Sequence, residues 1–220
     1  MRTVPAAWLA LVSLTGALAW GCGTSAPPPL DVPPPADAPP SGARPPKASK
    51  SAGATIDVAS LPSVDGAVPP LDEGRLTLSL PDDWFRLPRS KQYLVAAQLS
   101  RQAKYPAITI HVEAAGDADD VAPENWAADD LKDRAAEMQA DFDEQKVKLA
   151  EPVKPIRIGP FVGVQYARGA KVEKLPLERL FLVTVAGGRR YTVELRAVHG
   201  ELHKYRSLAL AVAASMRFGP

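Results

Sequence analysis

The chain has 220 residues, a formal net charge of +1 at pH 7 and a single cysteine, Cys22. This charge argues against a dedicated nucleic-acid-binding protein, for which a strongly basic domain is expected. One cysteine also excludes an intrachain disulfide and a thiol-ligated metal site. Of the 23 prolines, 13 lie in residues 27–70, so the chain divides into two unlike regions. The remaining 150 residues, from Leu71 onward, are enough for one domain with its own core.

Residues 1–22 have the pattern of an export signal, with Arg2 before an apolar stretch at residues 6–19. This stretch is shorter than the roughly 20 residues that a membrane-spanning helix needs. At the end of this stretch the sequence Ala19-Trp20-Gly21-Cys22 places small Ala19 and Gly21 before the cysteine, which resembles the lipobox of bacterial lipoproteins, with bulky Trp20 as a departure from it. The resemblance implies that Cys22 is lipidated and becomes the first residue of the mature protein. An ordinary cleaved signal, or an uncleaved anchor with a spare thiol, remains the alternative.

The lipobox also implies a location in the bacterial cell envelope. Gly23, rather than an aspartate, follows the cysteine. In lipoproteins this resembles the signal for sorting to the outer membrane, with the domain facing the periplasm.

Residues 23–70 are rich in proline, alanine and serine and contain no aromatic residue. Such a composition buries too little apolar surface to offset the entropy of ordering, so we expect a disordered tether. Proline-rich chain favours the extended polyproline conformation at about 3.1 Å per residue, which gives a reach on the order of 150 Å. The tether is a spacer that carries the domain away from the membrane, or a passive linker of no required length.

From Leu71 to Pro220 the apolar pattern predicts an α+β domain with the order β-β-β-α-β-β-β-β-α. Apolar residues alternate in the predicted strands and recur at helical spacing in the two predicted helices. Short turns between neighbouring strands favour a mainly antiparallel sheet of about six to seven strands. The expected strands are residues 75–80, 93–99, 107–113, 148–158, 161–168, 178–186 and 190–198, and the helices are residues 124–142 and a closing helix from Leu202.

The last hairpin has the clearest turn signal, because Gly187-Gly188 supplies the positive φ angles that a tight turn requires. Residues 169–176 are expected to form a loop. The strand at residues 148–158 contains two prolines, which favour an irregular edge strand.

Several short sequence segments in this region resemble those of one protein family. They are LTLSLPDDWF, ITIHVEA before an acidic helix, GPFVGVQYARG and a final segment that ends in SMRF. Together they resemble the PsbP-like superfamily and, within it, the DcrB-like bacterial lipoproteins. The resemblance implies an α/β/α sandwich around an antiparallel sheet and a non-enzymatic role. Leu80, Pro81 and Trp84 are expected to be structural, forming a turn that buries the indole.

No nucleophile motif, phosphate-binding loop or dinucleotide fingerprint occurs in the sequence, and no cofactor is predicted. The segment His199–His203 has two histidines four residues apart with Glu201 between them. It departs from the H-E-x-x-H zinc motif, and Gly200 places His199 before the helix, so we expect surface imidazoles rather than a metal site. A calcium site at Asp117, Asp119 and Asp120 is a weaker alternative to a solvated acidic loop.

Charge is unevenly distributed along the domain. Residues 113–144 hold 12 acids and 2 bases, whereas residues 145–220 hold 14 bases and 5 acids. Opposite-signed elements are either neighbours in the fold or parts of a surface that orients a partner. Arg189, Arg190 and Arg196 on the last hairpin are the candidate partner-binding residues.

We therefore expect a non-enzymatic, lipid-anchored module that binds a protein partner in the envelope. The alternatives are a small-molecule carrier, with a pocket between the sheet and a helix near Trp84 and Trp126, and a metal-dependent enzyme that uses His199, Glu201 and His203.

Overall fold

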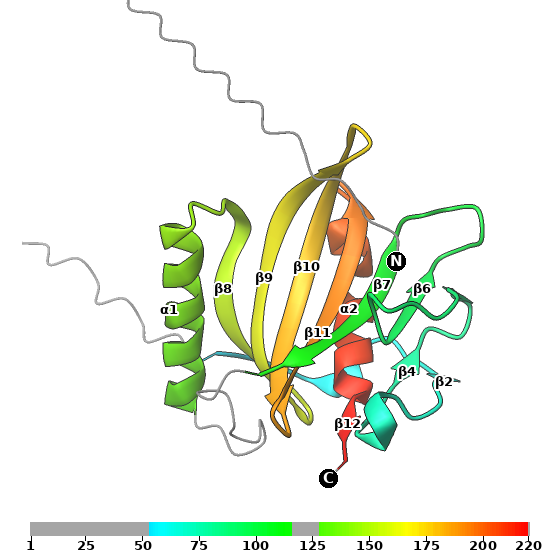
Figure 1. Ribbon diagram of the computed structural model, residues 1–220, viewed down its shortest axis with the longest axis horizontal. Coiled ribbons are helices and arrows are strands. Elements are labelled where there is room, and N and C mark those ends of the chain that lie inside the picture. The colour runs from blue at the N-terminus through cyan, green and yellow to red at the C-terminus, as the bar shows by residue number, and fades with distance from the viewer. Residues whose placement is uncertain (1–52, 116–127, 220) are drawn as a thin grey trace, which may run out of the picture. The chain divides into compact units, whose positions relative to one another are not determined.

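The computed structural model describes residues 53–115 and 128–219 (Figure 1). Cys22 and the predicted tether up to residue 52 lie outside the described residues. The acidic loop with Asp117, Asp119 and Asp120 also lies outside them, as does Trp126.

Most of the domain is one eight-stranded sheet. Every neighbouring pair is antiparallel except β1 and β8, which run parallel. The predicted mainly antiparallel sheet is confirmed, with eight strands rather than six or seven. In spatial order the strands are β1 (Ala54–Ile56), β8 (Leu149–Ile158), β9 (Phe161–Val172), β10 (Leu175–Ala186), β11 (Arg189–Val198), β7 (Ala107–Ala114), β6 (Val95–Gln98) and β5 (Phe85–Arg86).

Two helices, α1 (Ala128–Glu144) and α2 (Leu202–Ser215), pack on opposite faces of the sheet. Successive side chains of a strand point to opposite faces, and β10 shows the consequence. Leu180 and Leu182 join Val212 of α2 in the main core, whereas Phe181 packs with Ala135 of α1. The predicted α+β class with helices on both faces is therefore confirmed.

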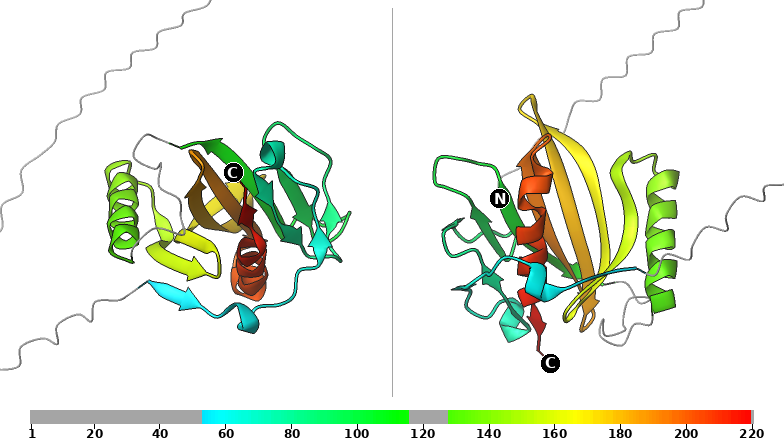
Figure 2. Two further views of the ribbon diagram at one scale, coloured as in Figure 1. Left: turned by 90° about the horizontal axis from the view of Figure 1, so that it is seen from below. Right: turned by 180° about the vertical axis from the view of Figure 1, so that it is seen from behind.

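The two helices cover unequal areas. Viewed from behind, α2 runs along the middle of the sheet, where it packs on β10 and β11 (Figure 2). On the other face α1 packs along β8 and β9, at one end of the sheet (Figure 1). Strands β11, β7 and β6 therefore have no helix of the described residues on the α1 side. Neither described helix has the length and apolar character that crossing a bilayer requires.

Two tight turns set the register of the central strands. Gly187 and Gly188 have φ angles of 55° and 67° and join β10 to β11 as the sequence predicts. The expected loop at residues 169–176 is wrong, because β9 continues to Val172 and β10 already begins at Leu175. Glu173 and Lys174 make this second turn with φ angles of 50° and 72°, which non-glycine residues rarely adopt.

The segment at residues 75–80 differs from the single strand predicted there. It forms two short strands outside the main sheet, because Leu78 interrupts the run. The pairs are β3 (Leu76–Thr77) with β12 (Arg217–Phe218), and β4 (Ser79–Leu80) with β2 (Gly66–Ala67). These pairings close the domain by bringing its C-terminal end beside the start of the chain segment that leads into β5.

The boundary at Leu71 is also corrected. Residues 53–70, which the composition assigns to the tether, belong to the domain and contain β1, a 3-10 turn at Val58–Ser60 and β2. Four aliphatic side chains from this segment pack against the main core: Ile56, Leu61, Val64 and Val68. Leu61, Val64 and Val68 have the spacing of a helix, yet residues 53–70 form no α-helix, so pattern alone does not reveal their partners.

Two contacts secure the region before β5. The buried Trp84 meets Tyr205 of α2 edge-on, with ring centres 6.4 Å apart, as expected for a structural indole. The buried Tyr191 of β11 donates a 2.7 Å hydrogen bond to Asp72. Burial, assisted by this hydrogen bond, raises the pKa of Tyr191 well above its ordinary value.

Candidate functional site

Strand alternation places a row of polar side chains on the half of the sheet that α1 leaves uncovered. Tyr191, Val193 and Leu195 of β11 are buried on the α2 side. The residues between them therefore point to the other face, where three of their four paired neighbours on β7 are polar: Glu113, His111 and Thr109. We call this surface the open face; its central residues are His111, Glu113, Arg190, Thr192, Glu194 and Arg196.

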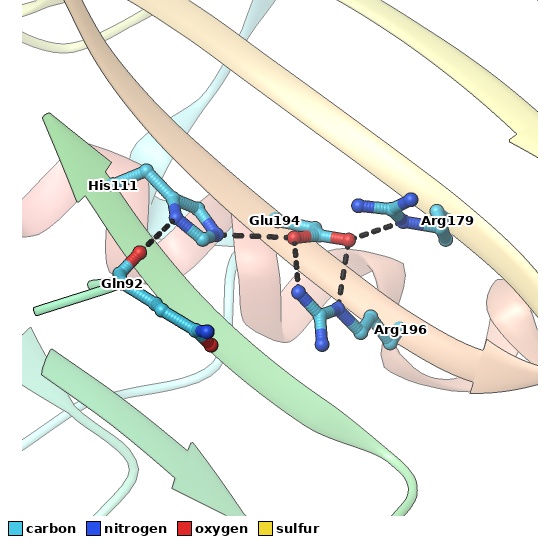
Figure 3. A network of polar contacts seen from close by, with 5 residues as sticks. All are labelled: Gln92, His111, Arg179, Glu194 and Arg196. Atoms are coloured by element: carbon cyan, nitrogen blue, oxygen red, sulfur yellow. Dashed lines mark hydrogen bonds and ion pairs between the residues drawn. The ribbon is translucent and has the colours of Figure 1, made fainter. Parts of the chain in front are cut away.

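Glu194 is the centre of the open face. Its side chain is only 1% exposed, and both carboxylate oxygens have hydrogen-bond partners (Figure 3). Arg196 donates from Nε and Nη2 to both carboxylate oxygens at 2.8 Å, and Nε of Arg179 donates to Oε1. Nε2 of His111 lies 3.1 Å from Oε2. A buried carboxylate is tolerated when it is paired and hydrogen-bonded in this way.

The protonation of this cluster follows from its contacts. Burial by itself raises the pKa of Glu194, but the hydrogen bonds from His111, Arg196 and Arg179 outweigh it and hold the pKa far below its ordinary value. Nδ1 of His111 lies 2.9 Å from the carbonyl oxygen of Gln92. Both ring nitrogens of His111 therefore face oxygen atoms of neighbouring residues.

Three arginines stand side by side across the sheet at one end of the open face. Arg179 of β10 pairs in register with Arg168 of β9 on one side and with Arg196 of β11 on the other. Both Arg168 and Arg179 place their guanidinium carbons 4.9 Å from the centre of the Phe181 ring. Among the described residues, Glu194 is the one carboxylate paired with this row.

A hollow lies over Arg179 and Arg196. It has a volume of about 400 Å³ and is also lined by Glu194 and the aromatic rings of Tyr166 and Phe181. A second hollow of about 210 Å³ extends it over β6. The two share Gln92, His111 and Arg196, so they adjoin each other. We call the pair the groove; together the two hollows span β10, β11, β7 and β6.

The three arginines predicted from sequence do not form one group. Arg190 and Arg196 lie on the open face, where Arg190 pairs with Glu113 at 3.5 Å. Arg189 is an odd-numbered residue of β11 and points to the α2 side, where Nη1 lies 3.1 Å from Asp72. Partner binding by these residues stays a prediction, and the geometry directs it to Arg190 and Arg196.

The segment His199–His203 lacks the geometry of a zinc motif. His199 follows β11 and lies 2.9 Å from Glu178, while His203 is exposed on α2. Glu201 precedes α2 and pairs with Lys204. Within residues 53–115 and 128–219, no three histidine, cysteine or acidic side chains come close enough together to hold a metal ion.

The carrier alternative places a pocket near Trp84. The side chain of Trp84 is buried against Tyr205 on the α2 side of the sheet. The hollow over the open face lies on the opposite side, so it is not the pocket that this alternative predicts.

Sequence analysis does not single out Arg168, Arg179 or Glu194. The signal that identifies the face is present in β11, where polar residues occupy every second position from Arg190 to Arg196. A central strand with one polar face has that face exposed. Arg168 joins this row through the register of β9 and β10, which the non-glycine turn at Glu173 and Lys174 conceals. His111 reaches Glu194 through the register of β7 and β11, which no short turn connects.

The comparisons with known proteins complete the description of the chain. No protein-family model and no curated protein matches the sequence. Among solved structures, similarity is found to cyanobacterial PsbP (CyanoP) from Synechocystis, with 13% identity, TM-score 0.36 and coverage of 72% of this chain and 99% of that one. LpqN, involved in cell envelope biogenesis of Mycobacterium tuberculosis, gives 17% identity, TM-score 0.40 and coverage of 66% and 83%.

A Bacteroides thetaiotaomicron protein gives 10% identity and TM-score 0.47, and the match covers 67% of this chain and 46% of that one. The chain thus spans less than half the length of the Bacteroides protein. A PsbP protein is among these likenesses, as the sequence resemblance predicts. At these identities and scores, function rests on the residues of the open face.

Proposed function

We propose that this protein is a lipid-anchored module of the bacterial cell envelope that binds a protein partner through its open face and catalyses no reaction. The observation that carries the proposal is the polar half of the sheet on the α1 side, which no helix of the described residues covers. An ordinary sheet face of this size is either covered by a helix or lined by scattered solvated residues. Here the face has a groove over a buried, fully paired carboxylate.

The cluster is better suited to binding than to catalysis. Both oxygens of Glu194 already accept hydrogen bonds, so neither is available as a general base. A paired network of this kind holds the side chains of Arg179 and Arg196 in fixed positions. Fixed side chains lose less entropy when a partner binds.

Anchoring rests on the sequence of the first 22 residues and on the proline-rich segment that follows. A lipid on Cys22 and a tether of several tens of residues would let the domain reach a partner away from the bilayer surface. The outer membrane, with the domain facing the periplasm, is the proposed location. Mass spectrometry of the N-terminal peptide tests the anchor, because an unmodified thiol at Cys22 contradicts it.

Site-specific photocrosslinking in cells tests the role of the open face. A photoreactive residue in place of Thr192 is expected to trap one defined protein, because Thr192 lies in the groove. The matched control is the same residue at Lys171, which is exposed on β9 and points to the α2 side. Products that are absent, or equal at both positions, contradict binding through the open face.

A further inference from the structure

The arginine row has more hydrogen-bond donors than the described residues can satisfy. Glu194 accepts from one nitrogen of Arg179 and from two of Arg196. The terminal nitrogens of Arg179 and Nη1 of Arg196 have no hydrogen-bond acceptor within residues 53–115 and 128–219. Arg168 has no carboxylate partner in that part of the chain either. Donors therefore remain available where the groove begins.

The charges at this end of the groove are also unbalanced. Three guanidinium groups and one carboxylate leave an excess of two positive charges on adjacent strands. Like charges directly opposite each other on neighbouring strands are destabilising. A bound anion removes this repulsion and accepts the free N–H groups. Planar guanidinium forks match the oxygens of a carboxylate or a phosphate.

Nearby acids favour a singly charged carboxylate over a dianionic phosphate. Glu113 lines the same groove as Glu194, and both repel a second negative charge on a ligand. Helix α1 adds exposed acids at Asp133, Glu137 and Asp141, and the last two line a hollow next to Arg190. A long polyanion such as nucleic acid would meet this acidic helix beside the groove.

The groove also has the length and walls for a peptide. It continues from the arginines past His111 to Tyr93 and Tyr105 on the β6 side. Next to the arginines, the rings of Tyr166 and Phe181 stack at 4.8 Å and provide an apolar wall. Aromatic and arginine side chains are the common anchors of protein interfaces.

We infer that the row Arg168, Arg179 and Arg196 binds carboxylate side chains of an acidic segment on the protein partner. This inference rests on the proposed function and adds the chemistry of the partner. The carboxylate lies against the free nitrogens of Arg179 and Arg196, with Arg168 as the flanking charge. The rest of the acidic segment follows the groove across β11 and β7.

Binding of a labelled peptide of alternating glutamate and glycine to the full-length protein in detergent tests this inference. The probe is expected to bind the wild-type protein and to bind less tightly as salt is raised. Arg179→Lys keeps a positive charge beside Glu194 but removes the planar guanidinium group, which can donate two parallel hydrogen bonds to a carboxylate. We therefore expect the variant to bind the peptide about tenfold more weakly. Arg168→Gln is expected to weaken binding by a similar factor. Lys171→Gln removes one charge from the opposite face of β9 and leaves binding unchanged.

Three results would overturn the inference. The first is equal binding of the same peptide with glutamine in place of glutamate. The second is unchanged binding in both arginine variants while neither unfolds at a lower temperature than wild type. Displacement of the peptide by inorganic phosphate at a lower concentration than by free glutamate would reassign the row to phosphate and also overturn it.

The outcome is separable from that of the proposed function. If Thr192 traps a partner and Arg168→Gln does not weaken its capture, the open face binds a partner without the arginine row. If the acidic peptide binds through the row and Thr192 traps nothing, the carboxylate site stands and partner binding through the rest of the face fails.

Discussion

Arg168 and Arg179 face each other directly across β9 and β10, and both rest against the ring of Phe181. Opposite-charge cross-strand pairs stabilise a sheet, whereas like-charge pairs destabilise it by a few tenths of a kcal/mol or more. Natural proteins retain such unfavourable arrangements chiefly where function requires them. The repulsion at this pair therefore has a measurable consequence for stability.

We expect Arg168→Gln to raise the free energy of unfolding by a few tenths of a kcal/mol. It removes the repulsion without breaking an ion pair, and Arg179 remains over the Phe181 ring when the contact of Arg168 with that ring is lost. Urea unfolding at low salt measures the change. High salt is expected to reduce the gain, since these side chains are partly exposed and screened. Arg196→Gln is the contrasting variant. It breaks two hydrogen bonds to Glu194 and should lower the free energy of unfolding. A loss of stability in Arg168→Gln would contradict the electrostatic account of the row.

Gly163 on β9 is required by close contact between strands. A Cβ there would lie 2.0 Å from the carbonyl oxygen of Val183, which is backbone and does not move independently. We expect Gly163→Ala to lower the free energy of unfolding by about 3 kcal/mol. Gly169 is the matched control on the same strand, because a Cβ there meets no atom within 4 Å. Gly169→Ala should remain within about 0.5 kcal/mol of wild type in the same urea titration.

The sequence predicts most of the central fold because several elements have strong local signals. The Gly187-Gly188 turn and the alternation in β11 identify the last hairpin, and the apolar spacing around Leu131 and Ala135 identifies the buried side of α1. Residues 53–70 are harder to predict, since distant partners order their apolar side chains and the helical spacing of Leu61, Val64 and Val68 does not correspond to a helix.

The open face was only half predictable. Arg190 and Arg196 are visible as basic residues on a predicted strand, and alternation places them on one side. Glu194 becomes the centre only when Arg179 and His111 arrive from neighbouring strands. Such long-range pairing depends on register, and a one-residue slip would place each side chain on the other face.

Glu194 makes the free energy of unfolding depend on pH in the acidic range. Its pKa is held below the ordinary value, so its ionised form stabilises the folded state above the unfolded-state pKa of about 4. This contribution is lost as pH falls from there through the lower folded-state pKa. We expect Glu194→Gln to cost about 2–3 kcal/mol at neutral pH, a value reduced because the arginines still reach solvent. The deficit should shrink as unfolding is measured at progressively lower pH.

Glu113→Gln is the control for this prediction. Glu113 is exposed and pairs with Arg190 on the same face, and such exposed pairs contribute about 0–1 kcal/mol. Its variant should therefore follow the wild-type acid dependence. A deficit in Glu194→Gln that stays constant from neutral to acid pH would show that the carboxylate is not the group whose charge matters.

The last prediction concerns the unequal attachment of the two helices. Leu131 and Ala135 are the buried residues of α1, and each belongs to a small cluster separate from the main core. By contrast, α2 buries every residue from Ala209 to Ala214. Local opening requires less free energy where fewer apolar contacts are broken. We therefore expect the amides of α1 to exchange hydrogen faster than those of α2 under native conditions.

Leu131→Ala removes a contact with Val162 and Val185 and is expected to cost about 2–3 kcal/mol. Because the loss is local to α1, amide exchange should accelerate there first, while β10 and α2 keep their relative protection. Leu210→Ala in α2 is the comparison, since Leu210 belongs to the main core and its loss should reduce protection in the sheet as well. Equal loss of protection in α1 and α2 after Leu131→Ala would show instead that the two helices open as one cooperative unit.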